Sequence, residues 1–243
     1  MSALKQAVQT VHRDPAWWRK TLIGGAWYLS GLGIPIAEGY QLESIENTNQ
    51  GYPTPLPLWR DLSTKALQGV FGLVIDFAYF VFPLLLVGLI AFCGAIGVLV
   101  ADLSSALIRS LVLAAAVLGS LWWLAMWLSS VSPLAKRLLV SEGQPGAGLS
   151  AQILRSAWEP MSRPLWLRAR LWSLPPYLLA LLLLALAWWA AARTGWLGTL
   201  PLLWLALAAL FYARLVTIQL YALAARELQQ RRYEAFRARL QTE

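Results

Sequence analysis

Charged residues are scarce in this sequence, and their scarcity excludes a soluble globular domain. Only 13% of the 243 residues are charged, whereas 58% are hydrophobic; a typical soluble domain has roughly 25% charged residues. A water-soluble chain of this length has no interior large enough to bury so many apolar side chains. The composition therefore predicts an integral membrane protein.

Cysteine and histidine each occur once, and this excludes several kinds of site. Cys93 lies inside an apolar run and has no second cysteine for an internal disulfide. His12 lies outside every apolar run, so no membrane segment offers a histidine ligand for haem, chlorophyll or a transition metal. The sequence also lacks a phosphate-binding glycine loop and a base near Ser104 and Ser105. We therefore expect no catalytic residue, no cofactor and no metal, and we expect that the chain is not an enzyme.

The charge that is present is mainly positive, with 20 Lys and Arg against 12 Asp and Glu. These basic residues lie between and beside the apolar runs rather than on a soluble face, which argues against nucleic acid as a partner. Their placement is typical of loops that face anionic lipid headgroups on the inner side of a membrane. Fourteen tryptophans agree with this, because tryptophan is enriched at membrane–water interfaces.

Five apolar runs set the number of membrane crossings. The first run, residues 21–36, is shorter than the ~20 residues needed to span, and it carries four glycines and Pro35. It is therefore either a short broken span or a re-entrant segment. The second run, residues 66–101, is longer than a bilayer requires, so we expect an interfacial first part and a bend near Pro83. The other runs are residues 103–134, 174–192 and 200–225.

The distribution of Lys and Arg favours four spans over five. If the first run spans, the 20 basic residues divide 14 to six between the two sides; if it is re-entrant, 18 lie on one side. Only Arg109 and Arg193 then lie on the other side. Because basic residues accumulate on the cytoplasmic side, we predict four spans, a re-entrant first segment and cytoplasmic termini.

These patterns predict a single all-α membrane domain, a polytopic helical bundle of about four spanning helices with interfacial amphipathic helices. Its expected segments are an interfacial helix and anchor (1–20), a re-entrant or short hydrophobic segment (21–36), a polar proline-rich connector (37–65), a spanning hairpin (66–134), a basic cytoplasmic loop (135–172), a second spanning hairpin (173–225) and a charged tail (226–243).

Asp76 and Arg214 are the candidate intramembrane pair. A carboxylate inside an apolar run is costly and by default a functional candidate, but near the inner boundary it is simply hydrated. Arg214 either pairs with Asp76 or extends its charge to the inner headgroups. Both alternatives place the two residues nearer the cytoplasmic side.

Aromatic, basic and proline-rich segments are candidate contacts with lipids or a protein partner. The proline-rich strip either docks a partner or acts as a stiff connector on the headgroups. The basic loop either binds acidic lipids or only determines the topology. The candidate contact residues are Trp17, Trp18, Arg19, Lys20, Pro55, Pro57, Trp59, Arg168 and Arg170.

Two stretches, residues 22–25 through 39–43 and residues 55–61, resemble an uncharacterised prokaryotic membrane family known as domain of unknown function 4013. Residues 211–215 through 220–221 are similar to the last helix of that family, and residues 43–48 are similar to its cyanobacterial members. The resemblance implies an intact membrane domain in a prokaryotic cell membrane, or in a thylakoid membrane if the chain is cyanobacterial. It implies no reaction.

Two functions remain open. The first is a non-enzymatic accessory, assembly or membrane-organising subunit that acts through helix packing and through contacts with anionic lipids or a protein partner. The second is a small permease or transporter component with its site near the broken first segment and Asp76. A polar cavity lined by Asp76 and that segment would favour transport, and a dry apolar interior would favour a partner subunit.

Overall fold

The protein is helical throughout the part of the chain that the structure describes. The computed structural model describes residues 2–100, 105–144 and 146–241, in which helices and turns occur but no strand. Four helices in these ranges are long and apolar enough to cross a membrane, which confirms the predicted all-α membrane bundle with four spans. They are Leu62–Val100, Ser105–Leu128, Arg163–Arg193 and Gly198–Leu240.

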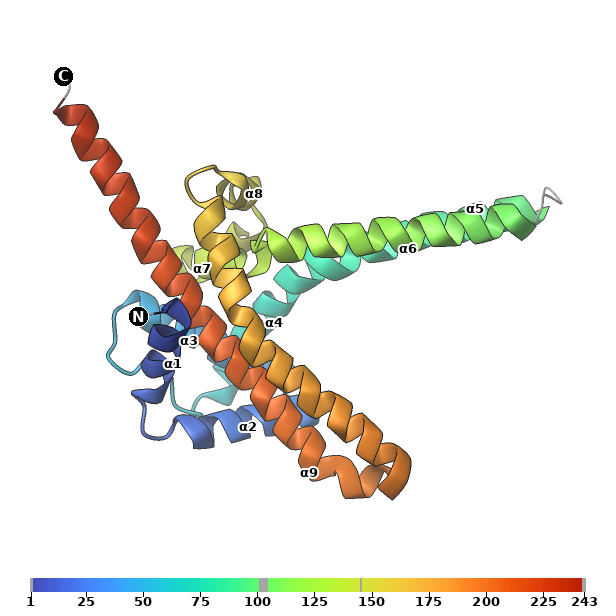
Figure 1. Ribbon diagram of the computed structural model, residues 1–243, viewed down its shortest axis with the longest axis horizontal. Helices are drawn as coiled ribbons and strands as arrows, with labels where there is room; N and C mark the ends of the chain where they lie inside the picture. The colour runs from blue at the N-terminus through green and yellow to red at the C-terminus, as the bar shows by residue number, and fades with distance from the viewer. Residues whose placement is uncertain (1, 101–104, 145, 242–243) are drawn as a thin grey trace.

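The four spans form two helical hairpins that diverge from a common base (Figure 1). The first hairpin contains α4 (Leu62–Asp76), the π-helical segment η1 (Phe77–Val81), α5 (Phe82–Val100) and α6 (Ser105–Leu128). The expected turn at residues 102–104 lies outside the described residues. The second hairpin is α9 (Arg163–Leu240), which folds back at Gly195. Gly195 has a φ of 76°, a conformation that glycine adopts without strain.

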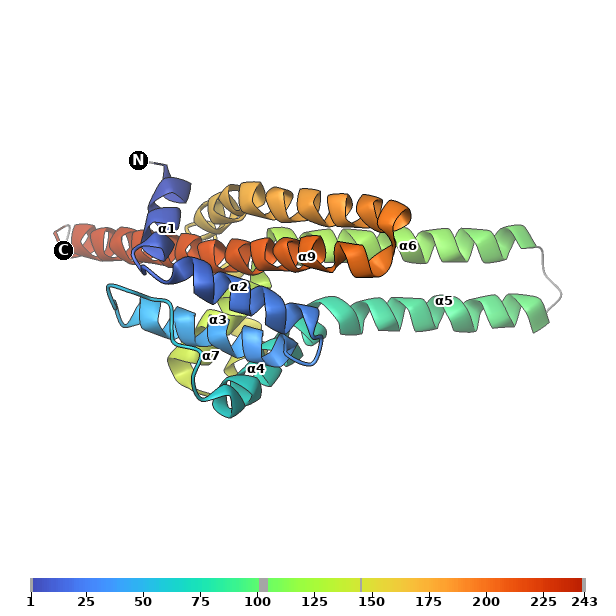
Figure 2. The same cartoon turned by 90° about the horizontal axis from the view of Figure 1, so that it is seen from below.

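Pro83 explains where the first hairpin bends. Proline has no backbone N–H, so the carbonyl of Tyr79, four residues earlier, loses its helical donor. The indole Nε1 of Trp122 on α6 donates to this carbonyl at 3.0 Å. The bend that the sequence predicts near Pro83 therefore lies in η1, where the chain passes from α4 into α5 (Figure 2).

The N-terminal third forms three short helices, α1 (Ala3–His12), α2 (Trp17–Leu29) and α3 (Ile34–Asn49). With 13 residues, α2 is about 20 Å long and too short to cross the ~30 Å hydrocarbon core. The first apolar run is thus divided between α2 and α3, which are joined by a turn at Gly31 (φ 68°). α2 packs on α9 and α3 packs on α4.

Glycines let these helices approach closely. A Cβ atom on Gly25 of α2 would lie 2.7 Å from the backbone of Ala208 on α9. Gly39 of α3 lies directly against the backbone of Lys65 on α4, and Gly69 of α4 lies against Pro35. Residues 34–49, which include much of the expected polar connector, are consequently a packed helix, and the extended strip is confined to residues 51–61.

The expected basic loop is mostly helical and closes the base between the hairpins. It contains α7 (Val131–Glu142), the 3₁₀ turn η2 (Ala147–Leu149), α8 (Ala151–Trp158) and the first turns of α9. Most of the buried apolar core lies at this base, around Tyr40 and Phe211 in one cluster and Ile75 and Ile153 in another. Both ends of the described chain lie away from the tip of the α5–α6 hairpin (Figure 2).

Candidate functional site

Four oppositely charged side chains meet at the base of the two hairpins, one from each of α3, α4, α7 and α9. The Nζ atom of Lys136 lies 2.5 Å from Oε1 of Glu38 and 2.6 Å from Oδ2 of Asp76. Arg214 lies 2.9 Å from Oε2 of Glu38 and 3.6 Å from Oδ2 of Asp76. Two carboxylates thus face two cations, and we call these four residues the charge network.

Burial makes the charge network depend on its internal partners. The side chain of Glu38 is fully buried and that of Lys136 is 8% exposed, whereas those of Asp76 and Arg214 are each 27% exposed. Ser132 donates to Asp76 at 2.5 Å, and Arg214 donates to the hydroxyl of Tyr28 at 2.7 Å. Removing one member of such a buried pair leaves an uncompensated charge, which typically costs about 3–5 kcal/mol.

The electrostatic balance keeps Lys136 charged. Burial alone lowers the pKa of Lys136, but Glu38 and Asp76 outweigh burial, so that its pKa is raised above the usual value. Burial raises the pKa of Tyr28, against the opposing effect of Arg214, and Tyr28 stays neutral. The lysine therefore holds the two carboxylates together throughout the neutral pH range.

Helix length predicts where the charge network lies relative to the membrane. Arg214 follows the start of the last span at Gly198 by about 16 residues, which is ~24 Å along a helix. The hydrocarbon core is ~30 Å thick. We therefore expect the network to lie close to the membrane boundary on the side opposite the hairpin turns.

A cavity of about 650 Å³, which we call the interhairpin groove, opens above the charge network. Phe80, Trp123 and Trp127 line it from the first hairpin, and Leu174 and Leu181 line it from the second. Its floor carries more cations than carboxylates. The charged residues that line it are Lys136, Arg137, Arg170, Arg214, Glu38 and Asp76.

Arg137 and Arg170 account for this excess of two positive charges. The buried Arg170 stacks over Trp127 at 4.9 Å, and its Nε has no hydrogen-bond partner among the described residues. The Nη1 atom of Arg137 is also buried without such a partner in the described part of the chain. Burial, together with the charge of Arg226, lowers the pKa of Arg137 to about 10. The side chains that line the groove therefore carry two more positive than negative charges.

Comparison with protein-family models shows one match, over residues 22–186, to the family described as "Protein of unknown function (DUF4013)". The chain belongs to this family. Comparison with curated proteins and with solved structures gave no match. The matched region of the DUF4013 chain contains Glu38, Asp76 and Lys136, whereas Arg214 lies beyond it.

The structure brings together Asp76 and Arg214, the pair proposed from the sequence of this DUF4013 chain, at 3.6 Å. Sequence reasoning missed Glu38 and Lys136. Their ion pair, at 2.5 Å, is shorter than the 3.6 Å between Arg214 and Asp76. Glu38 was assigned to a polar connector and Lys136 to a basic loop. The available signal was the uninterrupted stretch from Ile34 to Asn49, which has no helix breaker other than Pro35 in its first turn and Gly39.

Half of the predicted aromatic anchor faces inward in the DUF4013 chain. Trp18 and Arg19 are exposed and stack on each other at 5.0 Å, as an interfacial anchor requires. Trp17 instead stacks on His12 at 4.2 Å. Lys20 is buried and its Nζ atom lies 2.6 Å from Oδ2 of Asp14, so its charge is paired within the chain.

The proline-rich strip packs on its own chain, because its carbonyls and rings find partners on α2 and α3. Pro55 and Pro57 are buried, and the carbonyl of Pro57 accepts from the hydroxyl of Tyr40 at 3.0 Å. Trp59 stacks on Tyr40 at 4.1 Å and donates to the carbonyl of Lys20. The strip is thus a connector fixed to the helical base, in which Pro55 and Pro57 are buried.

The two predicted basic contacts on α9 differ in their surroundings. Arg168 is exposed and forms an ion pair with Glu227 on the returning arm of the α9 hairpin. Arg170 is buried in the floor of the interhairpin groove. In the described residues, no group of three or more His, Cys, Asp and Glu side chains is placed to hold a metal ion.

Proposed function

We propose that this DUF4013 chain is a non-enzymatic, membrane-organising protein that binds an anionic phospholipid in the interhairpin groove. The supporting observation is the groove itself, which combines apolar walls with a floor that carries two excess positive charges. Charged groups at a membrane boundary are matched by anionic headgroups, and apolar walls are matched by acyl chains.

The order of side chains along α9 supports this orientation of the lipid. Arg170, Leu174, Tyr177 and Leu181 all line the groove, and their spacing of four, three and four residues places them on one helix face. This face begins with a cation at the floor and becomes apolar away from it. A phospholipid of the inner leaflet has the same order, from phosphate to acyl chain.

The charge network supports a binding role more than a catalytic one. A general base needs a lone pair directed at a substrate, whereas Glu38 is fully buried and holds both Lys136 and Arg214. Asp76 is similarly held by Ser132 and Lys136. The α5–α6 hairpin, which packs mainly on itself, is the surface we assign to helix packing with a protein partner.

Filling the groove tests this proposal. Leu181 lines the groove and is 57% exposed, whereas Leu113 on α6 is 66% exposed and does not line it. We expect Leu181→Trp to reduce the number of phosphatidylglycerol molecules retained in native mass spectrometry, because the indole occupies acyl-chain space. Leu113→Trp serves as the matched control and is expected to retain the wild-type number. Equal retention by both variants would contradict the proposal.

A small permease is the second candidate, because Asp76 lines a cavity between the two hairpins. Transport needs the site to open to both sides of the membrane. In a Cys93→Ser background, Leu210→Cys places a thiol in the groove for membrane-impermeant maleimides. Labelling from both sides would favour a permease, and protection from the outer side would favour the lipid-binding role.

A further inference from the structure

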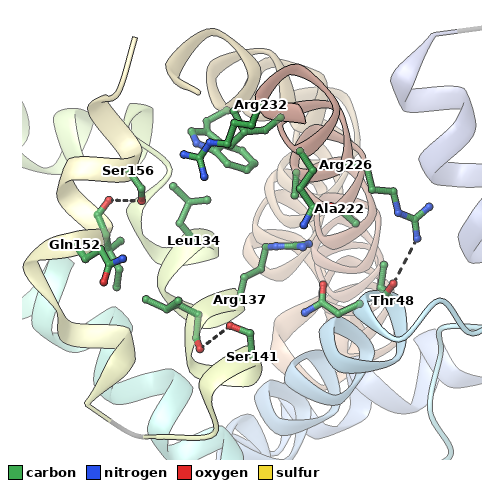
Figure 3. A pocket seen from close by; sticks show the side chains of 16 residues that line it. Thr48, Leu134, Arg137, Ser141, Gln152, Ser156, Ala222, Arg226 and Arg232 are labelled. Atoms are coloured by element: carbon green, nitrogen blue, oxygen red, sulfur yellow. Dashed lines mark hydrogen bonds between the residues drawn. The ribbon is translucent and has the colours of Figure 1, made fainter. Parts of the chain in front are cut away.

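A second cavity, of about 520 Å³, lies between α7, α8, the end of α3 and the last part of α9 (Figure 3). Its charged lining residues are Arg137, Arg226 and Arg232, and we call it the arginine pocket. No acidic residue belongs to its lining within the described ranges. Gln152 and Gln229 add neutral polar groups to its wall.

The three arginines are poorly neutralised by the protein. Arg232 forms an ion pair with Glu159 at 2.6 Å, and both side chains are exposed. Arg226 makes a long hydrogen bond of 3.4 Å to a neutral acceptor, the carbonyl of Thr48. Arg137 reaches from α7 toward α9 (Figure 3), and its buried Nη1 has no partner among the described residues.

Burying part of the Arg137 guanidinium group beside Arg226 without a carboxylate is unfavourable, because desolvation of Arg137 and repulsion from Arg226 act in the same direction, whereas Arg226 and Arg232 are themselves exposed. Burial and the charge of Arg226 both lower the pKa of Arg137, which means that the charged form of Arg137 is destabilised in the pocket. An anion in the pocket would remove the cost by accepting hydrogen bonds from the guanidinium groups. The planar donor fork of arginine matches the oxygens of a phosphoryl group particularly well.

We propose that the arginine pocket binds a phosphoryl group, carried by free phosphate, a soluble phosphate ester or a lipid headgroup. The cavity volume falls in the range of small-molecule sites. This site is separate from the lipid role of the interhairpin groove. Arg226 and Arg232 line only the arginine pocket and Arg170 lines only the groove, whereas Arg137 lines both cavities.

Thermal unfolding of the full chain in phosphatidylcholine nanodiscs tests the proposal with inorganic phosphate as the probe. A ligand that binds only the folded state raises the Tm in a saturable way. We expect such a rise for the wild type and about tenfold weaker binding for Arg226→Gln. Arg168→Gln, an exposed arginine that lines neither cavity, is the matched control and retains wild-type binding.

A second arm identifies the source of the phosphoryl group. Nanodiscs that contain phosphatidate, without free phosphate, should raise the Tm in an Arg226-dependent way if a headgroup is the ligand. A rise with phosphate alone assigns the site to a soluble anion. No Arg226-dependent rise in either arm overturns the proposal, and Arg170→Gln reports separately on the groove.

Arg137→Gln distinguishes binding from a purely structural role. Without an anion, we expect this variant to have a higher Tm than the wild type, because it removes a buried cation beside Arg226. With phosphate, we expect its Tm to stay unchanged. A lower Tm without anion, combined with an intact response to phosphate, would show that Arg137 stabilises the fold and takes no part in binding.

Discussion

Glu38 is the residue on which the charge network depends most. It is the only member that is completely buried, and it bonds both cations from a helix whose sequence gives little sign of membrane burial. Its partners lie 98 and 176 residues away along the chain. Local sequence patterns therefore reveal Asp76 and Arg214, which interrupt apolar runs, but not the carboxylate that joins them to Lys136.

Asp76→Asn and Arg214→Gln test the coupling within the network. Each change should lower the free energy of unfolding by about 1–3 kcal/mol, less than for the buried members, because it leaves a partner unpaired but the side chain removed is partly exposed. The double variant should lose less than the sum, by roughly 0.5 kcal/mol or more, since the two side chains interact directly and through Glu38 and Lys136. Denaturant unfolding of the four proteins measures this difference, and simple additivity would exclude the pair.

Lys136→Met tests the pH dependence of the same network. The raised pKa of Lys136 means that its contribution is fully present below its ordinary pKa of 10.5 and is lost as the pH rises through the folded-state value. We expect the variant to be less stable by about 3–5 kcal/mol at neutral pH. The difference from the wild type should stay constant up to pH ~10 and shrink above it. A difference that disappears near neutral pH would contradict this assignment.

At the scale of elements, the length of the apolar runs predicts the spanning helices well. The shorter helices α2 and α3 depend on their contacts with other helices. The two hairpins follow from runs that exceed the hydrocarbon thickness, and the bend at η1 follows from Pro83. α3 does not follow from such runs, because its 16 residues are mixed in polarity and are ordered by α4 and α9. The first apolar run, expected to be re-entrant, is divided between α2 and α3, and the contacts of these helices with α9 and α4 determine this arrangement.

Gly39→Ala tests the close contact of α3 with α4. The added methyl would meet the backbone of Lys65, which has no flexible end to move aside. We expect a loss of about 1–3 kcal/mol in stability from overpacking. Gly88→Ala on α5 is the control, because nothing lies within 4 Å of its new Cβ. Equal effects of the two changes on the Tm would show that α3 and α4 separate easily.

At the scale of the whole molecule, four helices that are long and apolar enough to span predict that both ends of the chain lie on one side of the membrane. The distribution of basic residues predicts that this side is the cytoplasm. Reporter fusions at the two ends should therefore both give the cytoplasmic signal, such as fluorescence of a fused green fluorescent protein together with inactivity of a fused alkaline phosphatase. Opposite signals from the two ends would require an odd number of spans.

The divergence of the two hairpins has a mechanical consequence. α5 and α6 are joined to the rest of the fold mainly through η1 and α7. A force that the bilayer exerts on the far end of this hairpin would therefore tilt α5 and α6 together about η1 and α7. A thinner or more tense membrane would then change the tilt of the α5–α6 hairpin and with it the width of the interhairpin groove. Distances between spin labels on the two hairpin tips, measured in bilayers of different thickness, should shift with thickness. Under the proposed function, the occupancy of the interhairpin groove by a phospholipid would then depend on the thickness of the membrane.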